Sequence, residues 1–158
     1  MKNEVKSVIE CFRQLKYENI NGRRKMKLNP RADVSNFELV GDFMEAFGQQ
    51  VELEPTWPDF NTRELRLDLI QEELDELAQA MEDRDMVQIA DALTDLLYVV
   101  YGAGHAFGID LDECFQEVHS SNMSKLGPNG KPIHREDGKV MKGPGYFEPD
   151  LENILGAL

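Results

Sequence analysis

The sequence predicts an all-α fold: an antiparallel four-helix bundle with a helical N-terminal arm and a Gly/Pro-rich basic C-terminal tail. Apolar residues recur at helical spacing in successive segments, and helix-start signals precede these segments. After Ser121, glycines and prolines replace the helical pattern. The 158 residues suit a single domain, with the arm at 1–34, the helical core at 35–121 and the tail at 122–158.

The arm begins with an amphipathic helix that extends to about Tyr17. A basic, turn-rich stretch follows from Asn19 to Arg31. Packing or contact between subunits is the favoured role of this arm. The weaker alternative is phosphate binding, for which the candidates are Arg23, Arg24 and Lys25.

The first two core helices have recognisable ends. Ser35, followed three residues later by Glu38, forms a capping box that opens a helix through Ala46. Asn61 or Thr62 is expected to cap the second helix, which ends near residues 83–85.

The third core helix is apolar on nearly every side from Ile89 to Val100 and extends to about Phe107. A helix of this kind is expected to be buried. A fourth helix begins at Asp110. Because a lone bundle does not cover so apolar a helix, the sequence predicts a homodimer, which could pair further into a tetramer.

Carboxylates interrupt the apolar faces of the second and third helices. Glu73 and Glu76 lie inside or at the edge of the apolar surface of the second helix. Asp91 and Asp95 are four residues apart and share one stripe of the third. A buried ionised carboxylate is costly unless it is paired or binds a metal. The alternative is that these acids are ordinary solvated surface charges.

Few basic residues are available to neutralise these acids. Only three Lys or Arg residues lie between Phe60 and Phe107, namely Arg63, Arg66 and Arg84. A divalent ion is therefore the simplest counter-charge. The candidate ligands are all oxygens, which favours Mg²⁺, with Mn²⁺ as the alternative, over zinc. Calcium would lack its usual binding loop.

The run Glu72-Glu73-Leu74-Asp75-Glu76, followed by an apolar helix containing Asp95, resembles the EExxE and ExxD pattern of the all-α nucleoside triphosphate (NTP) pyrophosphohydrolases. This superfamily includes MazG-like proteins, dimeric dUTPases and phosphoribosyl-ATP pyrophosphohydrolases. Three further stretches are similar to a MazG-like branch with dUTPase-type activity: 95–102, 108–110 and 117–125, which includes Ser121-Asn122-Met123-Ser124-Lys125. The resemblance extends roughly from Phe37 to Leu151.

The resemblance implies that Glu73, Glu76 and Asp95 coordinate Mg²⁺. Where the superfamily usually has a Glu three residues before the Asp, this chain has Ala92, and Asp91 is expected to replace that ligand. Glu72 is the candidate for a second ion or for the general base.

The tail is expected to bind the substrate. Between Lys125 and Lys142 its five basic residues outnumber its two acids, which suits this stretch of an acidic protein to hold a triphosphate. The resemblance identifies Asn122 and Lys125 as nucleotide ligands. Tyr146 either flanks a base or docks the tail. The other candidate substrate residues are Lys139 and Lys142. A hairpin is expected around Asp137-Gly138, and a short helix from Asp150 to Leu155.

Composition restricts the classes of partner. Seventeen basic and thirty acidic residues give a net charge of -13, which argues against sequence-independent nucleic-acid binding. Two cysteines and no signal peptide predict a cytoplasmic protein, and the apolar runs are judged too short for a membrane span.

The leading hypothesis is Mg²⁺-dependent hydrolysis of an NTP, with dUTP favoured, to a monophosphate and pyrophosphate. In the family reaction, water attacks the α-phosphorus. The alternatives are hydrolysis of phosphoribosyl-ATP and a non-catalytic acidic helical adaptor that binds a basic partner.

Overall fold

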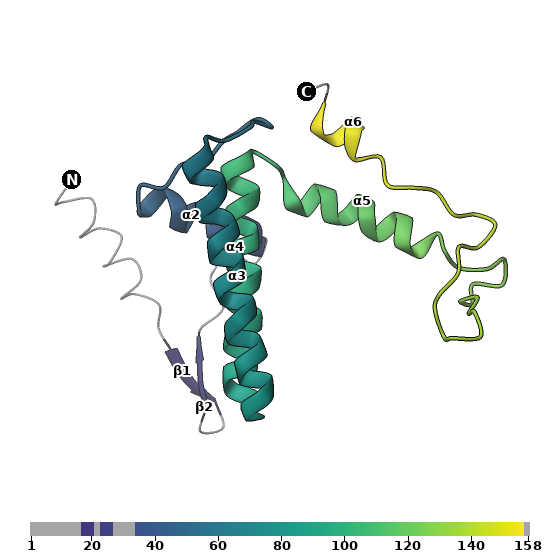
Figure 1. The fold of residues 1–158 in the computed structure, drawn as a ribbon, viewed down its shortest axis with the longest axis horizontal. Coiled ribbons are helices and arrows are strands. Elements are labelled where there is room, and N and C mark those ends of the chain that lie inside the picture. Colours follow the sequence, from purple (N-terminus) through teal and green to yellow (C-terminus); the bar gives the residue numbers. More distant parts are fainter. Residues whose placement is uncertain (1–16, 21–22, 27–33, 157–158) are drawn as a thin grey trace.

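The computed structural model describes residues 17–20, 23–26 and 34–156 (Figure 1). The amphipathic helix predicted up to about Tyr17 and the side chains of Arg23, Arg24 and Lys25 lie outside the described part. Strands β1 (Tyr17–Ile20) and β2 (Arg23–Met26) form an antiparallel hairpin in which Tyr17 is opposite Met26. The rest of the described chain is helical or loop.

Helix α2 (Asn36–Ala46) begins at the predicted capping box. Ser35 Oγ accepts a hydrogen bond from the Glu38 amide at 3.1 Å, and the Ser35 amide donates to Glu38 Oε2 at 2.7 Å. Helix α3 (Phe60–Asp83) instead begins after Asp59, two or three residues before the predicted cap. Asp59 Oδ1 accepts from the Thr62 amide at 2.8 Å, so the prediction of Asn61 or Thr62 as the cap was wrong. Asp59 has an extended backbone, and its carboxylate accepts from the Thr62 amide, which would otherwise be free in the first turn of the helix.

Helix α4 (Met86–Phe107) ends at the predicted residue, and helix α5 (Leu111–Met123) begins directly after Asp110, as predicted. Asp85 and Asp110 cap them through their carboxylates. Gly108, with φ of 65°, ends α4 in the left-handed conformation that glycine adopts without strain.

The tail contains the two predicted elements. His134 pairs with Val140, and the Arg135 amide donates to the Lys139 carbonyl at 2.9 Å, which confirms a hairpin-like turn around Asp137-Gly138. Helix α6 (Leu151–Leu155) follows, capped by Asp150.

Helices α3 and α4 form a long antiparallel pair, and α2 packs against α4 near one end of that pair (Figure 1). Helix α5 leaves the end of α4 and extends away from the pair, with α6 beside it. The described helices of a single chain therefore do not close into the predicted four-helix bundle. Helices α4 and α5 approach each other closely where they meet, because a Cβ on Gly104 would lie 2.7 Å from Leu111 Cγ.

The contact of α2 with α4 is centred on a buried histidine. His105 Nε2 lies 2.8 Å from the Phe37 carbonyl oxygen, and the His105 ring stacks on the Phe37 ring with centroids 3.8 Å apart. Val40, Met44 and Ala106 are buried around it. Gly41 faces the imidazole, where an added Cβ would lie 2.8 Å from His105 Cε1.

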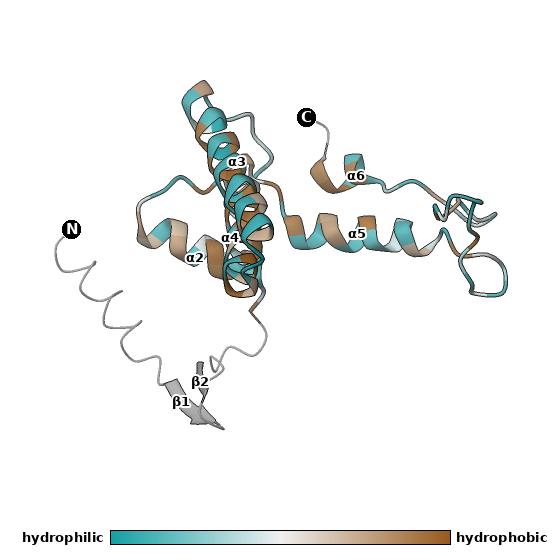
Figure 2. Ribbon diagram, turned by 60° about the horizontal axis from the view of Figure 1, so that its bottom comes forward, coloured by the Kyte–Doolittle hydropathy of each residue, from teal (hydrophilic) through white to brown (hydrophobic). Residues whose placement is uncertain are grey.

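The predicted burial of α4 is wrong for a single chain. One helical stripe of α4, made of Met86, Leu93, Leu97 and Val100, is exposed. On α3, Leu77 and Ala80 are buried, but the neighbouring stripe of Leu67, Leu74 and Met81 is exposed by 62%, 47% and 55%. Figure 2 shows apolar residues distributed along both helices. Since α5 extends away, nothing in the described chain covers these stripes.

The prediction that the apolar runs are too short for a membrane span was wrong for helix α4. Its 22 residues, with a mean hydropathy of 1.2 over the best window, are long and apolar enough to cross a membrane by length and composition alone. Asp91 and Asp95 lie within it, and carboxylates in hydrocarbon are costly.

Gly41→Ala should destabilise the protein by about 1–3 kcal/mol, because the His105 ring is held by a stack and a hydrogen bond and cannot move aside without loss. Gly145→Ala is the matched control, since no atom lies near its added Cβ, and it should change stability by less than about 0.5 kcal/mol. Urea unfolding measures both. Equal stability of the two variants would contradict the packing described for His105.

Candidate active site

The antiparallel α3/α4 pair brings the acids of the two helices into one electrostatic environment. The pKa of Glu73 is raised, first by partial burial and then by the negative charges of Asp95, Glu76, Glu72 and Asp91. Four carboxylates on two helices thus oppose the ionisation of a fifth. The residues that sequence reasoning proposed as ligands are the ones that act on Glu73.

Their exposure differs from the prediction. Glu73 and Asp95 are half-buried, whereas Glu72, Glu76 and Asp91 are exposed. Within residues 34–156, no three His, Cys, Asp or Glu side chains are arranged to hold a metal ion. The expectation that Asp91 is shielded from solvent is therefore wrong for a single chain.

No basic side chain neutralises this cluster in the described part of the chain. None of the five carboxylates forms an ion pair there. Arg66 lies seven residues before Glu73 and therefore on the same face of α3, but it turns to Gln49, whose Oε1 accepts from Arg66 Nη2 at 3.1 Å. Arg63 lies over the Trp57 ring at 4.9 Å.

Sequence reasoning missed that Arg66 is buried. It is 7% exposed, burial lowers its pKa, and its Nε has no hydrogen-bond partner. Gly102 leaves the space for it, because a Cβ there would lie 3.2 Å from Arg66 Nη1. The seven-residue spacing to Glu73 was the signal that could have placed Arg66 on the inner face of α3.

The chemistry of the acidic cluster fits a hard divalent cation. All its donors are carboxylate oxygens, which Mg²⁺ and Mn²⁺ prefer. Glu73 and Glu76 are spaced i, i+3 on α3, and Asp91 and Asp95 are spaced i, i+4 on α4, so each pair shares a helix face. A cation here would remove the repulsion that raises the pKa of Glu73.

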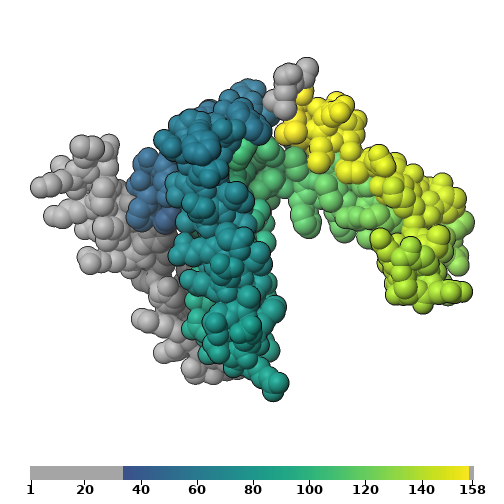
Figure 3. Space-filling view, in the orientation of Figure 1, coloured from purple at the N-terminus to yellow at the C-terminus, as the bar shows by residue number. Residues whose placement is uncertain are grey.

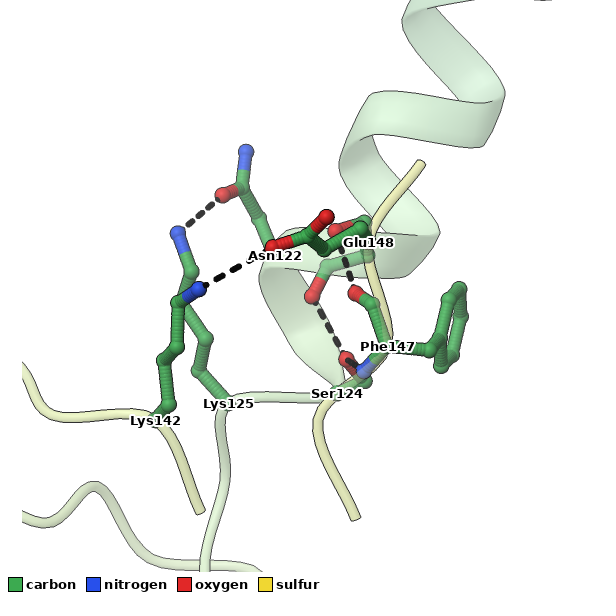
Figure 4. A network of polar contacts seen from close by, with 7 residues as sticks. Asn122, Ser124, Lys125, Lys142, Phe147 and Glu148 are labelled. Atoms are coloured by element: carbon green, nitrogen blue, oxygen red, sulfur yellow. Dashed lines mark hydrogen bonds and ion pairs between the residues drawn. The ribbon is translucent and has the colours of Figure 1, made fainter. Parts of the chain in front are cut away.

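A second group of predicted residues gathers where the tail meets the C-terminal end of α5 (Figure 4). Lys125 Nζ donates to Asn122 Oδ1 at 2.5 Å. Lys142 Nζ lies 4.1 Å from the centre of the Tyr146 ring and 3.5 Å from Glu148 Oε1, and both neighbours raise its pKa, Tyr146 more than Glu148. Lys139 is not part of this group, because it lies on the 135–139 turn.

The acidic cluster and the tail group lie in different parts of the molecule. In Figure 3, the α3/α4 pair joins α5 and the tail at one end, and open space separates the two parts below that end. One chain by itself therefore does not bring the tail lysines to the acids of α3 and α4.

The helical fold and the acidic cluster agree with the predicted resemblance to the all-α NTP pyrophosphohydrolases. Residues 40–122, more than half of the chain, match the phosphoribosyl-ATP pyrophosphohydrolase family. The chain therefore belongs to this family, and the predicted resemblance to the superfamily is confirmed.

Two similar proteins extend the comparison. The chain is 43% identical over 112 residues to "Uncharacterized protein L479" of Acanthamoeba polyphaga mimivirus, in a match that covers 68% of this chain and 42% of the viral protein. The chain thus spans less than half the length of that relative. The chain is also similar to the crystal structure of a candidate NTP pyrophosphohydrolase from Exiguobacterium sp. 255-15, with 25% sequence identity and a TM-score of 0.42. This match covers 75% of the present chain and 91% of the Exiguobacterium chain.

Glu73→Gln should stabilise the metal-free protein at neutral pH. Because the folded state raises the Glu73 pKa, the wild-type protein loses stability as pH rises from the ordinary carboxyl range through that raised value. The amide lacks this penalty, so its advantage in melting temperature should be present at pH 7 and vanish near pH 4.

Glu82→Gln provides the matched control for this measurement, since Glu82 is exposed near the end of the same helix. Thermal unfolding in chelator-treated buffer across pH 4–8 measures both variants. A Glu73→Gln protein that is less stable than the wild type at pH 7 would contradict the repulsion described here.

Proposed function

We propose that this protein hydrolyses a nucleoside triphosphate to the monophosphate and pyrophosphate in a Mg²⁺-dependent reaction, with dUTP as the favoured substrate and Mn²⁺ as an alternative ion. The main support for this proposal is the cluster of like charges around Glu73. No basic residue of the described chain forms an ion pair with these carboxylates. Membership of a pyrophosphohydrolase family supports the reaction class.

In this proposal Glu73, Glu76 and Asp95 hold the metal, and Asp91 completes the site. The ion would neutralise phosphate charge and lower the pKa of a bound water. Glu72, one residue before the half-buried Glu73, takes the role of general base or contributes to a second ion. In the tail, Asn122, Lys125, Lys142 and Tyr146 bind the nucleotide, and Lys139, on the 135–139 turn, adds positive charge to the tail.

The exposed apolar stripes support a homodimer. The α3 stripe of Leu67, Leu74 and Met81 and the α4 stripe of Met86, Leu93, Leu97 and Val100 have the heptad-related spacing with which helices pack together. Two α3/α4 pairs, one from each chain, would complete a four-helix bundle and cover these stripes. In this arrangement the tail of one chain is free to approach the acids of its partner.

Phosphoribosyl-ATP is the second candidate substrate, because it is named in the description of the matched family. A panel of NTPs, dNTPs and phosphoribosyl-ATP, assayed for pyrophosphate with and without Mg²⁺, separates the two. Orthophosphate as the sole product would exclude the proposed cleavage position. Turnover that persists in chelator would exclude the metal dependence.

Glu73→Ala and Asp95→Ala should each lower kcat by about a hundredfold or more, because each removes a proposed metal ligand. Asp75→Ala is the matched control within the same motif, since Asp75 is exposed and accepts from Gln71 Nε2 at 2.8 Å. It should retain wild-type turnover. Circular dichroism checks that all three variants stay helical, and an active Glu73→Ala variant would refute the assignment.

Mixed dimers test whether two chains build one site. Glu73→Ala and Lys125→Ala proteins are inactive separately if both residues are needed. When the two are unfolded and refolded together, half of the dimers are mixed, and each has one intact site if the tail serves the partner's acids. The mixture should regain about a quarter of wild-type activity. No recovery would mean that each chain builds its own site.

A further inference from the structure

We propose that Ser121 and Ser124 are positioning residues: their hydroxyls form a latch that fastens the C-terminal tail to α5 and thereby holds Lys142 and Tyr146 beside Asn122 and Lys125. This inference rests on the proposed function for its effect on substrate binding. The latch itself is a structural arrangement of four hydrogen-bonding groups and is testable without any substrate.

Ser121 forms the buried half of the latch. It is 3% exposed, and its Oγ donates to the Phe147 carbonyl oxygen at 2.8 Å, which joins α5 to a residue 26 positions further along the chain. Because the hydroxyl is buried, the hydrogen bond is not easily replaced by water. The tail backbone is thus held at Phe147.

Ser124 forms the second half, on the other side of the same residue (Figure 4). The Phe147 amide donates to Ser124 Oγ at 3.1 Å, and Ser124 Oγ donates to the Ser121 carbonyl oxygen at 2.7 Å. Both backbone groups of Phe147 are therefore bound by serine hydroxyls, one through its carbonyl and one through its amide. This fixes the position and the direction of the tail at this point.

Two further contacts keep the neighbouring tail in place. The Gly143 amide donates to the Lys125 carbonyl oxygen at 3.0 Å, and the Asp150 amide donates to Glu117 Oε1 at 2.9 Å. The Gly143 contact requires a residue without a side chain, because a Cβ there would lie 2.8 Å from the Lys125 carbonyl oxygen. The tail is therefore shaped to lie on the end of α5.

The latch has a consequence for charge. Gly143 is bonded to Lys125, so Lys142 and Lys125 project from neighbouring backbone segments, and Figure 4 shows both ammonium groups on the Asn122 side. Ammonium groups that project from two neighbouring backbone segments suit a polyphosphate, which carries several negative charges. A Gly/Pro-rich segment without the latch would lose entropy when it is ordered by the ligand, which weakens binding.

The test compares Ser121→Ala and Ser124→Ala with two controls. Ser120→Ala removes an exposed hydroxyl from the adjacent position, and Ser124→Thr keeps the hydroxyl. Hydrogen exchange of the free protein should show about tenfold faster exchange of the Phe147 amide in both alanine variants and no change in the controls. Unchanged exchange in Ser124→Ala would overturn the latch.

Ligand binding tests the positioning role. Both alanine variants should raise KM for dUTP and the Kd for inorganic tripolyphosphate about tenfold, with kcat within about twofold of wild type. Lys142→Ala should weaken binding in the wild type but add little in the Ser121→Ala background. Gly143→Ala should give the same KM effect by displacing the tail, independently of either serine.

Faster exchange with unchanged KM and unchanged tripolyphosphate binding would overturn the positioning role, since the latch would then be merely structural. A lower kcat in both alanine variants, with KM unchanged, would also overturn the positioning role. Absence of turnover in the wild type would refute the proposed function instead, and the exchange and tripolyphosphate measurements would still decide the latch.

Discussion

Electrostatic repulsion around Glu73 is the constraint on which the site depends. An antiparallel helix pair places acids from α3 and α4 near one another, and their charges raise the pKa of Glu73. Such a cluster is destabilising unless a cation neutralises it, because like charges at close range repel one another. Arg66, on the same face of α3, is hydrogen-bonded to Gln49, so in the proposal a metal ion supplies the positive charge.

Helices α3 and α4 are also more exposed to solvent in a single chain than their composition predicts. Glu73 and Asp95 are only half-buried in one chain, and the apolar stripes of α3 and α4 are exposed. A second α3/α4 pair would cover the stripes and remove their apolar surface from water. Dimerisation and catalysis are linked in the proposal because the tail of one chain would reach the acids of its partner.

The sequence predicted those features of the fold that depend on residues close to one another along the chain. The capping box at Ser35, the end of α3, the end of α4 and the start of α5 at Asp110 follow local rules and were confirmed. The direction of α5 was not predictable, because it depends on tertiary packing that local patterns do not encode. The burial of α4 was overestimated, since periodicity states which face is apolar but not what covers it. The ligand assignments came from resemblance and remain predictions.

Diffraction from crystals soaked in Mn²⁺ tests the central claim most directly, because the anomalous signal locates the ion without reference to activity. The account predicts one or two peaks between α3 and α4, with carboxylate oxygens of Glu73, Glu76 and Asp95 at about 2.1–2.3 Å. It also predicts that the peaks disappear in Glu73→Ala crystals. No anomalous peak between the helices, or those carboxylates directed into bulk solvent in the assembled protein, would contradict the account.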